Sequence, residues 1–314
     1  MYKCASFFAG VGGIDIGFEQ ANFSVVYANE FDKDACTTYN KNSNIVADCR
    51  DIREVKCEEI PDFDIMLAGF PCQAFSIAGY REGFDDKKGR GNLFFELVRI
   101  AENKKPKVIF LENVKNLLTH DNGNTMSVIL NELNKLGYST KYKVMNTCKY
   151  GNVPQNRERI YIVAFLEKEF CKKFEFPEEM LLAKTIKDIV GVDKKEDTYY
   201  YTEKFKYFDE LKQNMKNEKT VYQWRRKYVR ENKHNLCPTL TANMGTGGNN
   251  VPLVVTKFGI RKLTPRECFL FQGFPETFGL PKELSDYKLW KQAGNSVSVP
   301  VIFRIAQNIM RCLN

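Results

Sequence analysis

The sequence predicts an α/β protein in which a mostly parallel sheet is covered by helices on both faces. Short apolar runs alternate with amphipathic stretches through the first 165 residues, and this alternation is typical of a parallel sheet with crossover helices. After Phe165 the chain becomes rich in Lys, Glu and aromatic residues, with weak periodicity. An apolar helical pattern returns over 301–313.

Each predicted element follows from a local pattern. Apolar runs of strand length are bounded by polar or turn residues, whereas the helical stretches place apolar residues three or four positions apart. Strands are predicted at 2–8, 25–29, 64–68, 108–111 and 159–165, and helices at 13–21, 32–39, 93–103, 125–136 and 301–313.

The change in composition after Phe165 predicts a second domain or a large insertion. The C-terminal helix resembles the first part of the chain in style, so we expect the chain to return to the first domain. We therefore predict one domain from 1–180 and 285–314, and a smaller mixed domain over 181–284.

Composition narrows the class of protein. The net charge is +8, which permits a polyanionic partner. The ten cysteines include no C-x-x-C pair and there are only two histidines, so no metal site is expected. No signal-peptide core or membrane-length apolar run is present. We expect a cytoplasmic protein with no membrane partner and with reduced cysteines.

One segment concentrates positive charge. Residues 219–233 carry Lys and Arg at six positions against the single acid Glu231, with aromatic residues between them. The segment fits either a solvated basic face or a patch that contacts phosphates and bases.

Cys72 lies in the stretch Gly69–Ser76, directly after a proline and close to the end of the apolar run 65–68. Loops at strand ends form the ligand crevice of open α/β sheets. A cysteine ordinarily packs as a small hydrophobic residue, so a nucleophilic role for Cys72 requires suitable neighbours.

Those neighbours follow the next strands. Glu112 comes directly after the run 108–111 and would meet Cys72 if both strands are parallel. A carboxylic acid there makes sense as a proton donor to a ring nitrogen while the thiol attacks. Arg157 and Arg159 alternate before the next strand, where one could hold a phosphate and the other a base carbonyl.

A glycine-rich turn follows the first predicted strand. Gly10, Gly12 and Gly13 open the first helix, where backbone can approach a ligand closely and a helix N-terminus attracts negative charge. Glu30 ends the next strand and could bind ribose hydroxyls, and Asp48 could meet an adenine amino group. Both acids also fit helix-capping or surface roles.

Together these motifs resemble the bacterial DNA cytosine-C5 methyltransferases, over the whole chain except about 166–236. The resemblance rests on an ordered series that also includes Glu30 and Asp48. Its motifs are Phe-x-Gly-x-Gly-Gly (8–13), Gly-Phe-Pro-Cys-Gln (69–73), Gly-Asn-Leu-Phe (91–94), Glu-Asn-Val (112–114), Gln-x-Arg-x-Arg (155–159), Arg-Lys-Leu-Thr-Pro-Arg-Glu-Cys (261–268), Gln-Gly-Phe-Pro (272–275) and Gly-Asn-Ser-Val (294–297).

The resemblance implies a Rossmann-like fold that binds S-adenosylmethionine and methylates a cytosine flipped out of double-stranded DNA. Cys72 would attack C6, Glu112 would act at N3 and the exocyclic amine, Arg159 would contact the ring carbonyl, and Arg157 the adjacent phosphate. The implied cofactor contacts are Phe7, Gly10, Gly12, Glu30, Phe31, Asp48, Pro71, Leu93, Asn295 and Val297.

The resemblance also implies a DNA-reading region at about 180–260 and a closing loop at 76–91. It suggests a monomer with a functional companion, a restriction endonuclease. Candidate DNA contacts, each of which is by default a solvated or turn residue, are Ser76, Arg225, Arg226, Arg230, Thr241 and Asn243.

Three other functions are compatible with parts of the pattern. A cytosine methyltransferase acting on tRNA could use the same scaffold, although the substantial recognition region with its Thr-Leu-Thr-Ala-Asn-Met stretch (239–244) argues against it. A nicotinamide oxidoreductase would not need Pro-Cys beside Glu-Asn-Val. A catalytically inactive DNA-binding relative would not need to retain Cys72, Glu112 and Arg159.

Overall fold

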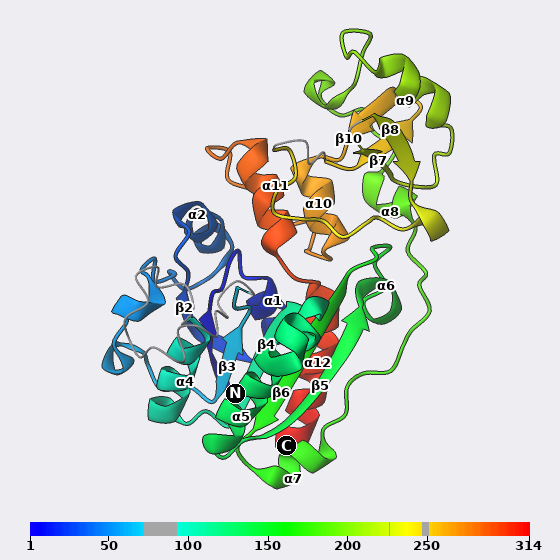
Figure 1. Ribbon diagram of the computed structural model, residues 1–314. Coiled ribbons are helices and arrows are strands. Elements are labelled where there is room, and N and C mark those ends of the chain that lie inside the picture. Colours follow the sequence, from blue (N-terminus) through cyan, green and yellow to red (C-terminus); the bar gives the residue numbers. More distant parts are fainter. Residues whose placement is uncertain (72–92, 226, 247–250) are drawn as a thin grey trace. The chain divides into compact units, whose positions relative to one another are not determined.

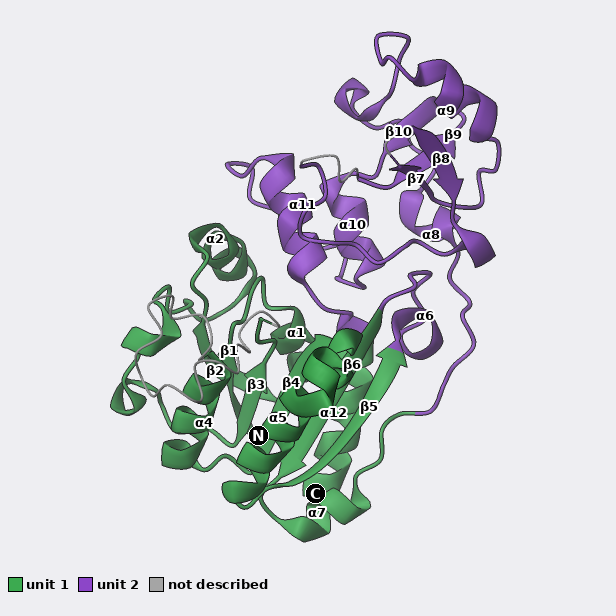
Figure 2. Cartoon of the chain, viewed as in Figure 1, with its two compact units in different colours: residues 1–145, 158–177, 301–314 green, residues 146–157, 178–300 purple. Residues whose placement is uncertain are grey.

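The computed structural model describes residues 1–71, 93–225, 227–246 and 251–314. The chain forms two compact units (Figure 2). Unit 1 comprises Met1–Met145, Glu158–Pro177 and Val301–Asn314, and unit 2 comprises Asn146–Arg157 and Glu178–Pro300. The boundaries predicted from composition were 180/181 and 284/285. The units divide instead at 177/178 and 300/301, and 146–157 joins unit 2.

Within the described residues, unit 1 is built on a six-stranded sheet in the order β2-β1-β3-β4-β6-β5 (Figure 1). The pairs β1–β2, β1–β3 and β3–β4 are parallel, whereas β4–β6 is antiparallel. The predicted α/β fold with a mostly parallel sheet is confirmed. The strands are β1 (Lys3–Phe7), β2 (Ser24–Asn29), β3 (Ile65–Ala68), β4 (Val108–Val114), β5 (Ser139–Asn146) and β6 (Glu158–Phe165).

Helices cover both faces of this sheet because its central strands are apolar on both sides. On one face, Phe7, Met66 and Leu111 share a buried cluster with residues of α4 (Leu93–Lys104) and α5 (Asn124–Lys135). On the other face, Phe18 of α1 (Gly13–Gln20) packs edge-on against Phe110, with ring centroids 5.2 Å apart.

The C-terminal helix α12 (Val299–Leu313) returns to unit 1 from Val301 onward, as expected from its sequence pattern. Gly17 of α1 lies against Ile302, close enough that a Cβ on Gly17 would come within 2.6 Å of the Ile302 side chain. The remaining elements of unit 1 are α2 (Lys33–Asn42), η1 (Ile52–Glu54), η2 (Cys57–Glu59), η4 (Lys115–Leu118), η5 (His120–Gly123) and α7 (Lys168–Lys173).

Unit 2 contains a four-stranded sheet in the order β10-β9-β7-β8, as far as its described residues show. Tyr222 and Trp224 of β7 pack with Leu211 of α9 in its core. Its strands are β7 (Tyr222–Arg225), β8 (Tyr228–Glu231), β9 (Leu253–Thr256) and β10 (Gly259–Lys262). Its helices are α6 (Thr147–Tyr150), α8 (Ile186–Val190), η6 (Asp197–Tyr199), α9 (Phe208–Asn214), η7 (Lys233–Asn235), α10 (Pro265–Phe271) and α11 (Asp286–Asn295).

The clearest element that the sequence did not predict is β5. Its residues are mostly half-buried, and only Met145 among them is fully buried. An edge strand of this kind has no continuous apolar run to reveal it. None of the helices in the described ranges has the length and apolar character needed to span a bilayer.

The α1–α12 contact yields a stability test. Gly17→Ala should lower the free energy of unfolding by about 2 kcal/mol, because the new methyl group must displace Ile302 in a close-packed contact. Chemical denaturation measures the change, with Ser127→Ala on the exposed side of α5 as a control expected to be near neutral. A stabilised Gly17→Ala protein would contradict the packing of α12 on α1.

Candidate active site

A carboxylate and a guanidinium face each other where β4 and β6 pair. Glu112 is 8% exposed, and Arg159 Nε lies 3.3 Å from Glu112 Oε1. The antiparallel register places Arg159 opposite Val114, two residues beyond Glu112 on the same side of the pair. Arg159 also donates from Nη1 to the Glu158 carbonyl at 2.8 Å. The pair is thus held by strand geometry as well as by charge.

The end of β3 lies beside this pair. Ala68 pairs with Leu111, so Gly69 comes next to Glu112, and a Cβ on Gly69 would lie 3.7 Å from Glu112 Oε2. Asn113 donates from Nδ2 to the Phe70 carbonyl at 2.8 Å. This bond joins the chain just before the Pro-Cys sequence (71–72) to the residue that follows Glu112.

Cys72 itself lies outside the described residues, as do Ser76 and the predicted loop 76–91. Pro71 is the last described residue before that segment and is exposed, and Leu93 is the half-buried first residue of α4 after it. From the sequence, Asn113 was noted only as the middle residue of the Glu-Asn-Val motif (112–114), with no role of its own. Its position directly after Glu112 is the signal that could have assigned it a positioning role.

The glycine-rich turn after β1 adopts an unusual backbone. Phe8, Gly10 and Gly12 all have positive φ, at 54°, 57° and 84°, a region that glycine enters freely and other residues enter at a cost of about 1–2 kcal/mol. A Cβ on Gly10 would meet nothing within 4 Å. The backbone at Gly10 is therefore open to a close ligand. Phe7, by contrast, is fully buried in the core against Tyr27.

Glu30 follows β2 and binds this turn. Its Oε2 accepts a hydrogen bond from Gly10 N at 2.8 Å, and its Oε1 accepts one from Asp32 N at 2.8 Å. Burial raises the pKa of Glu30, and these backbone bonds oppose the rise. Phe31, the next residue, is 70% exposed. Two of the predicted cofactor-binding groups, Gly10 and Glu30, are thus directly bonded.

A backbone hydrogen bond holds Asp48 next to Glu30: the Glu30 N–H donates to the Asp48 carbonyl at 3.1 Å. The Asp48 carboxylate accepts two hydrogen bonds from Arg50 and one from Tyr27. The hydrogen bonds from Arg50 are the largest influence that lowers the pKa of Asp48. Asp48 is thus a charged acceptor beside the end of β2, with Arg50 and Tyr27 already bound to it.

Cys36 and Cys49 form a disulfide with Cα atoms 6.3 Å apart, so the expectation that the cysteines are reduced is wrong for this pair. The separation is within the usual range for a disulfide. The bond links α2 to the residue after Asp48. Nothing in the sequence marks it, because the two cysteines are 13 residues apart and lie in different elements. The free cysteines in the described residues are Cys4, Cys57, Cys148, Cys171, Cys237, Cys268 and Cys312.

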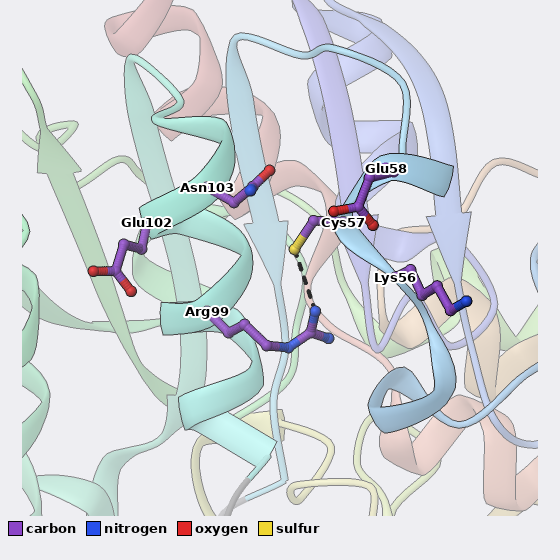
Figure 3. Close-up of a pocket in the computed structure, with 6 residues that line it drawn as sticks. All are labelled: Lys56, Cys57, Glu58, Arg99, Glu102 and Asn103. Atoms are coloured by element: carbon purple, nitrogen blue, oxygen red, sulfur yellow. Dashed lines mark hydrogen bonds between the residues drawn. The ribbon is translucent and has the colours of Figure 1, made fainter.

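Two surface hollows lie elsewhere and are lined by none of the predicted site residues. One, of about 500 Å³, lies between α4 and the 56–58 segment (Figure 3). Arg99 is one of the residues that line this hollow, and its guanidinium already donates to Cys57 Sγ and to the Ile52 and Val55 carbonyls. The other, of about 210 Å³, lies between α8 and β9 in unit 2.

Comparison with known proteins decides the family. The family model for C-5 cytosine-specific DNA methylases matches residues 2–311. The chain belongs to this family. The methylase is 60% identical to the type II methyltransferase M.Bsp6I of Bacillus sp. strain RFL6, over the full length of both chains. It is 40% identical to the type II methyltransferase M.HhaI of Haemophilus parahaemolyticus, over 98% of this chain and 94% of that one.

Solved structures show the same fold. The Entamoeba histolytica methyltransferase EhMeth matches with a TM-score of 0.78 at 18% identity, over 100% of this chain and 99% of that one. The predicted family and fold are therefore confirmed, and the methylase is a DNA cytosine-5 methyltransferase. The alternative of a tRNA methyltransferase is not favoured by the family model or by these bacterial relatives.

Arg157 of the methylase belongs to unit 2 and is 2% exposed. Its Nη1 donates to the Leu240 carbonyl at 2.9 Å, and its Nη2 donates to the Gly294 and Ser296 carbonyls. The predicted contact with a DNA phosphate does not fit this burial. The guanidinium instead joins two segments of unit 2, a long-range role that local sequence does not reveal.

The same two segments touch through their backbones. A Cβ on Gly294 would lie 2.2 Å from the Thr241 carbonyl, so only glycine fits there. Thr241 and Asn243 are exposed, and Thr241 Oγ1 donates to Asn243 Oδ1 at 2.7 Å. Asn295 is exposed at the end of α11, and Val297 is buried. The structure thus places Asn295 and Val297 in unit 2, whereas the other predicted cofactor-binding residues are in unit 1.

The remaining predicted DNA contacts lie on the β7–β8 hairpin. Register pairs Gln223 with Arg230 and Arg225 with Tyr228, so these four side chains share one face. Arg225 and Arg230 are exposed, and both donate to Gln223 Oε1. The opposite face carries Trp224, which is buried in the core of unit 2. Arg226 lies outside the described residues.

The different settings of the two arginines generate a stability prediction. Arg157→Ala should lower the free energy of unfolding of the methylase by about 3 kcal/mol, because buried carbonyl groups lose their hydrogen bonds from the guanidinium. Arg159→Ala should cost only about 1 kcal/mol, because Arg159 makes one long ion pair and one backbone bond. Urea unfolding compares the two, and equal losses would contradict the structural role assigned to Arg157.

Proposed function

We propose that the methylase transfers a methyl group from S-adenosylmethionine to C5 of a cytosine flipped out of a specific duplex DNA sequence, through a covalent bond between Cys72 and C6. The observation that carries this proposal is the Asn113–Phe70 hydrogen bond. It ties the chain that leads into the Pro-Cys sequence to the strand that bears Glu112, next to Arg159.

The chemistry needs a nucleophile and a proton donor together. Cytosine C5 is a poor nucleophile, and addition of the Cys72 thiolate at C6 moves the C5–C6 π electrons onto C5. Glu112, as the carboxylic acid, donates a proton to N3 and stabilises the charge that develops in the ring. After methyl transfer the C5 proton leaves, the S–C6 bond breaks, and aromaticity returns.

Arg159 fits a supporting role in this scheme. Its position beside Glu112 lets the guanidinium donate to the ring carbonyl while the carboxyl group acts at N3. Its positive charge also favours a nearby thiolate over a thiol. Arg157 has no direct role in this proposal, because its guanidinium is engaged within unit 2.

The residues of unit 1 fit an adenosine-type cofactor. Open space at Gly10, the carboxylate of Glu30 bound to the same turn, and the adjacent Asp48 form a polar group of the type that binds ribose and adenine. S-adenosylmethionine would supply an electrophilic methyl group there. Further proposed cofactor contacts are Phe31, Gly12, Pro71, Leu93, Asn295 and Val297, and the buried side chain of Phe7 leaves its backbone as the available contact.

The type II relatives favour a specific DNA substrate and a companion endonuclease that cuts the same sequence when it is unmethylated. A base inside a duplex cannot reach buried catalytic groups, so the target must be flipped out, at a cost of a few kcal/mol. We propose that the protein acts in the cytoplasm as a monomer, and that unit 2 is its target-recognition domain.

The β7–β8 hairpin is the proposed reading element of unit 2. A two-stranded ribbon fits the DNA major groove, and arginine is the usual partner of guanine there. Gln223 holds Arg225 and Arg230 together on the exposed face, beside Tyr228. Ser76, Arg226, Thr241 and Asn243 remain proposed DNA contacts.

Removal of one hairpin charge tests the reading element. Arg230→Ala should weaken binding to the methylated target duplex at least tenfold and reduce the slope of log K against log salt by about 1. Lys257→Ala removes the same charge from the exposed β9–β10 turn of the same unit and serves as the matched control. Equal effects of the two substitutions would leave the hairpin without a specific role.

The reaction is tested with labelled S-adenosylmethionine and either duplex DNA or tRNA, followed by bisulfite sequencing. Wild-type protein should label cytosines in DNA, and Cys72→Ser should lose methyl transfer by at least 1000-fold while it keeps cofactor affinity.

A DNA duplex with 5-fluorocytosine at the target position provides the covalent test. The fluorine cannot leave as a proton does, so the Cys72–C6 bond should persist and appear as a shifted protein band. If the labelled methyl group appeared on tRNA alone, DNA would be refuted as the substrate. Wild-type turnover by Cys72→Ser would refute the covalent mechanism.

A further inference from the structure

A buried carboxylate that the reaction does not use lies beneath the glycine-rich turn. Asp15 is in the first turn of α1 and is 3% exposed. Its Oδ1 accepts a hydrogen bond from Ser6 Oγ at 2.5 Å, and its Oδ2 accepts one from Tyr39 at 2.7 Å. Through these bonds Asp15 connects β1, α1 and α2, the three elements that surround the turn.

Tyr39 carries this connection to the turn. The Tyr39 side chain is almost fully buried, and a Cβ on Gly12 would lie only 3.1 Å from its ring. The ring therefore packs directly under Gly12, which has positive φ and precedes α1. On the other side Gly10 N is held by Glu30. Positive φ is costly for Phe8, and the turn that holds it together with Gly10 and Gly12 needs such support from its surroundings.

We propose that Asp15 is a positioning residue of the cofactor site, which holds Tyr39 under Gly12 and so keeps the glycine-rich turn in its cofactor-binding shape. This inference rests on the proposed function, since it assumes that the turn binds S-adenosylmethionine. Asp15 touches neither the cofactor nor the target base and acts through Tyr39 and Ser6.

Protonation of Asp15 should weaken this support. Burial raises the pKa of Asp15 to about 6, although the bonds from Ser6 and Tyr39 lower it. The ionised group accepts from both hydroxyls, whereas the protonated group forces one of them to turn. Burial raises the pKa of Cys4 on β1, Glu19 on α1 and Tyr39 on α2, and the nearby Asp15 charge adds to the rise in each group.

Protonation of Asp15 changes folding stability and cofactor affinity in opposite directions, so the two can be told apart. The pKa of Asp15 in the folded protein lies above its ordinary value near 3.8. Its contribution to folding stability therefore grows as pH falls from about 6 to about 4. Cofactor affinity should fall over the same range. A loss of affinity in acid that comes from Asp15 thus cannot be caused by Asp15-linked unfolding.

The experiment measures the Kd for S-adenosylmethionine by calorimetry on the full chain between pH 5 and 8. Wild type should lose affinity for S-adenosylmethionine as pH falls through about 6. This acid-side fall in affinity is the acid limb of the pH profile. Tyr39→Phe should raise Kd about threefold to tenfold at pH 7.5 and move the acid limb to higher pH, because a bond that lowers the pKa of Asp15 is gone. At saturating cofactor its kcat should stay within about twofold of wild type.

Tyr138→Phe is the matched control. Tyr138 is also a buried tyrosine of unit 1, and its hydroxyl donates to the Pro106 carbonyl at 2.6 Å. The control should lose comparable stability but keep the wild-type Kd and acid limb. Titration of Glu30 would contribute equally to wild type, Tyr39→Phe and Tyr138→Phe, so it cannot produce a shift in Tyr39→Phe alone.

Asp15→Asn should remove the limb that Tyr39→Phe shifts. Should Asp15→Asn fail to fold, Tyr39→Phe and Ser6→Ala decide the question, since each removes a single donor. Wild-type affinity and an unshifted acid limb in both would overturn the proposal. A wild-type protein that binds no S-adenosylmethionine at any pH would instead overturn the proposed function.

Discussion

The common direction of β1, β3 and β4 is the constraint on which the rest of unit 1 depends. Because these strands are parallel and in register, their carboxyl ends reach one edge of the sheet together. The glycine-rich turn and residues 69–71 follow that edge, and Glu112 lies close to it within β4. Residues from positions 10 to 112 thus converge without any long-range recognition beyond the pairing of apolar strands.

Much of this arrangement could be predicted from the sequence because the signals are local. The apolar runs of β1, β3 and β4 and the glycines after β1 can each be recognised locally, and Glu112 directly follows the apolar part of β4, although the strand itself continues to Val114. Arg157 shows where such reasoning fails. Alternation with Arg159 suggested a shared side, but its partners at Leu240 and Ser296 are 83 and 139 residues away. The edge strand β5 and the Cys36–Cys49 bond could likewise not be predicted, because no local sequence pattern indicates either of them.

The two sides of the glycine-rich turn are held by acids of different character. Glu30 binds the turn through backbone N–H groups and remains able to accept further hydrogen bonds, as a ligand-binding group must. Asp15 is enclosed and accepts hydrogen bonds from the side-chain hydroxyls of Ser6 and Tyr39, as a supporting group must. Burial raises the pKa of both. The fold therefore places considerable electrostatic cost beneath one short turn, which is typical of segments whose shape matters for function.

The path of the chain between the units has a consequence for how unit 2, the proposed recognition domain, can vary. The chain passes between units 1 and 2 at 145/146, 157/158, 177/178 and 300/301, so each unit is assembled from separate stretches and a single backbone cleavage releases neither. The stretch 178–300 nevertheless leaves unit 1 once and returns once. Replacement of this stretch therefore needs only two junctions, but the incoming stretch must supply carbonyls for Arg157 and a glycine at the close backbone crossing. It must also supply the proposed cofactor contacts at positions 295 and 297, whereas the strands that carry Glu112 and Arg159 stay in place.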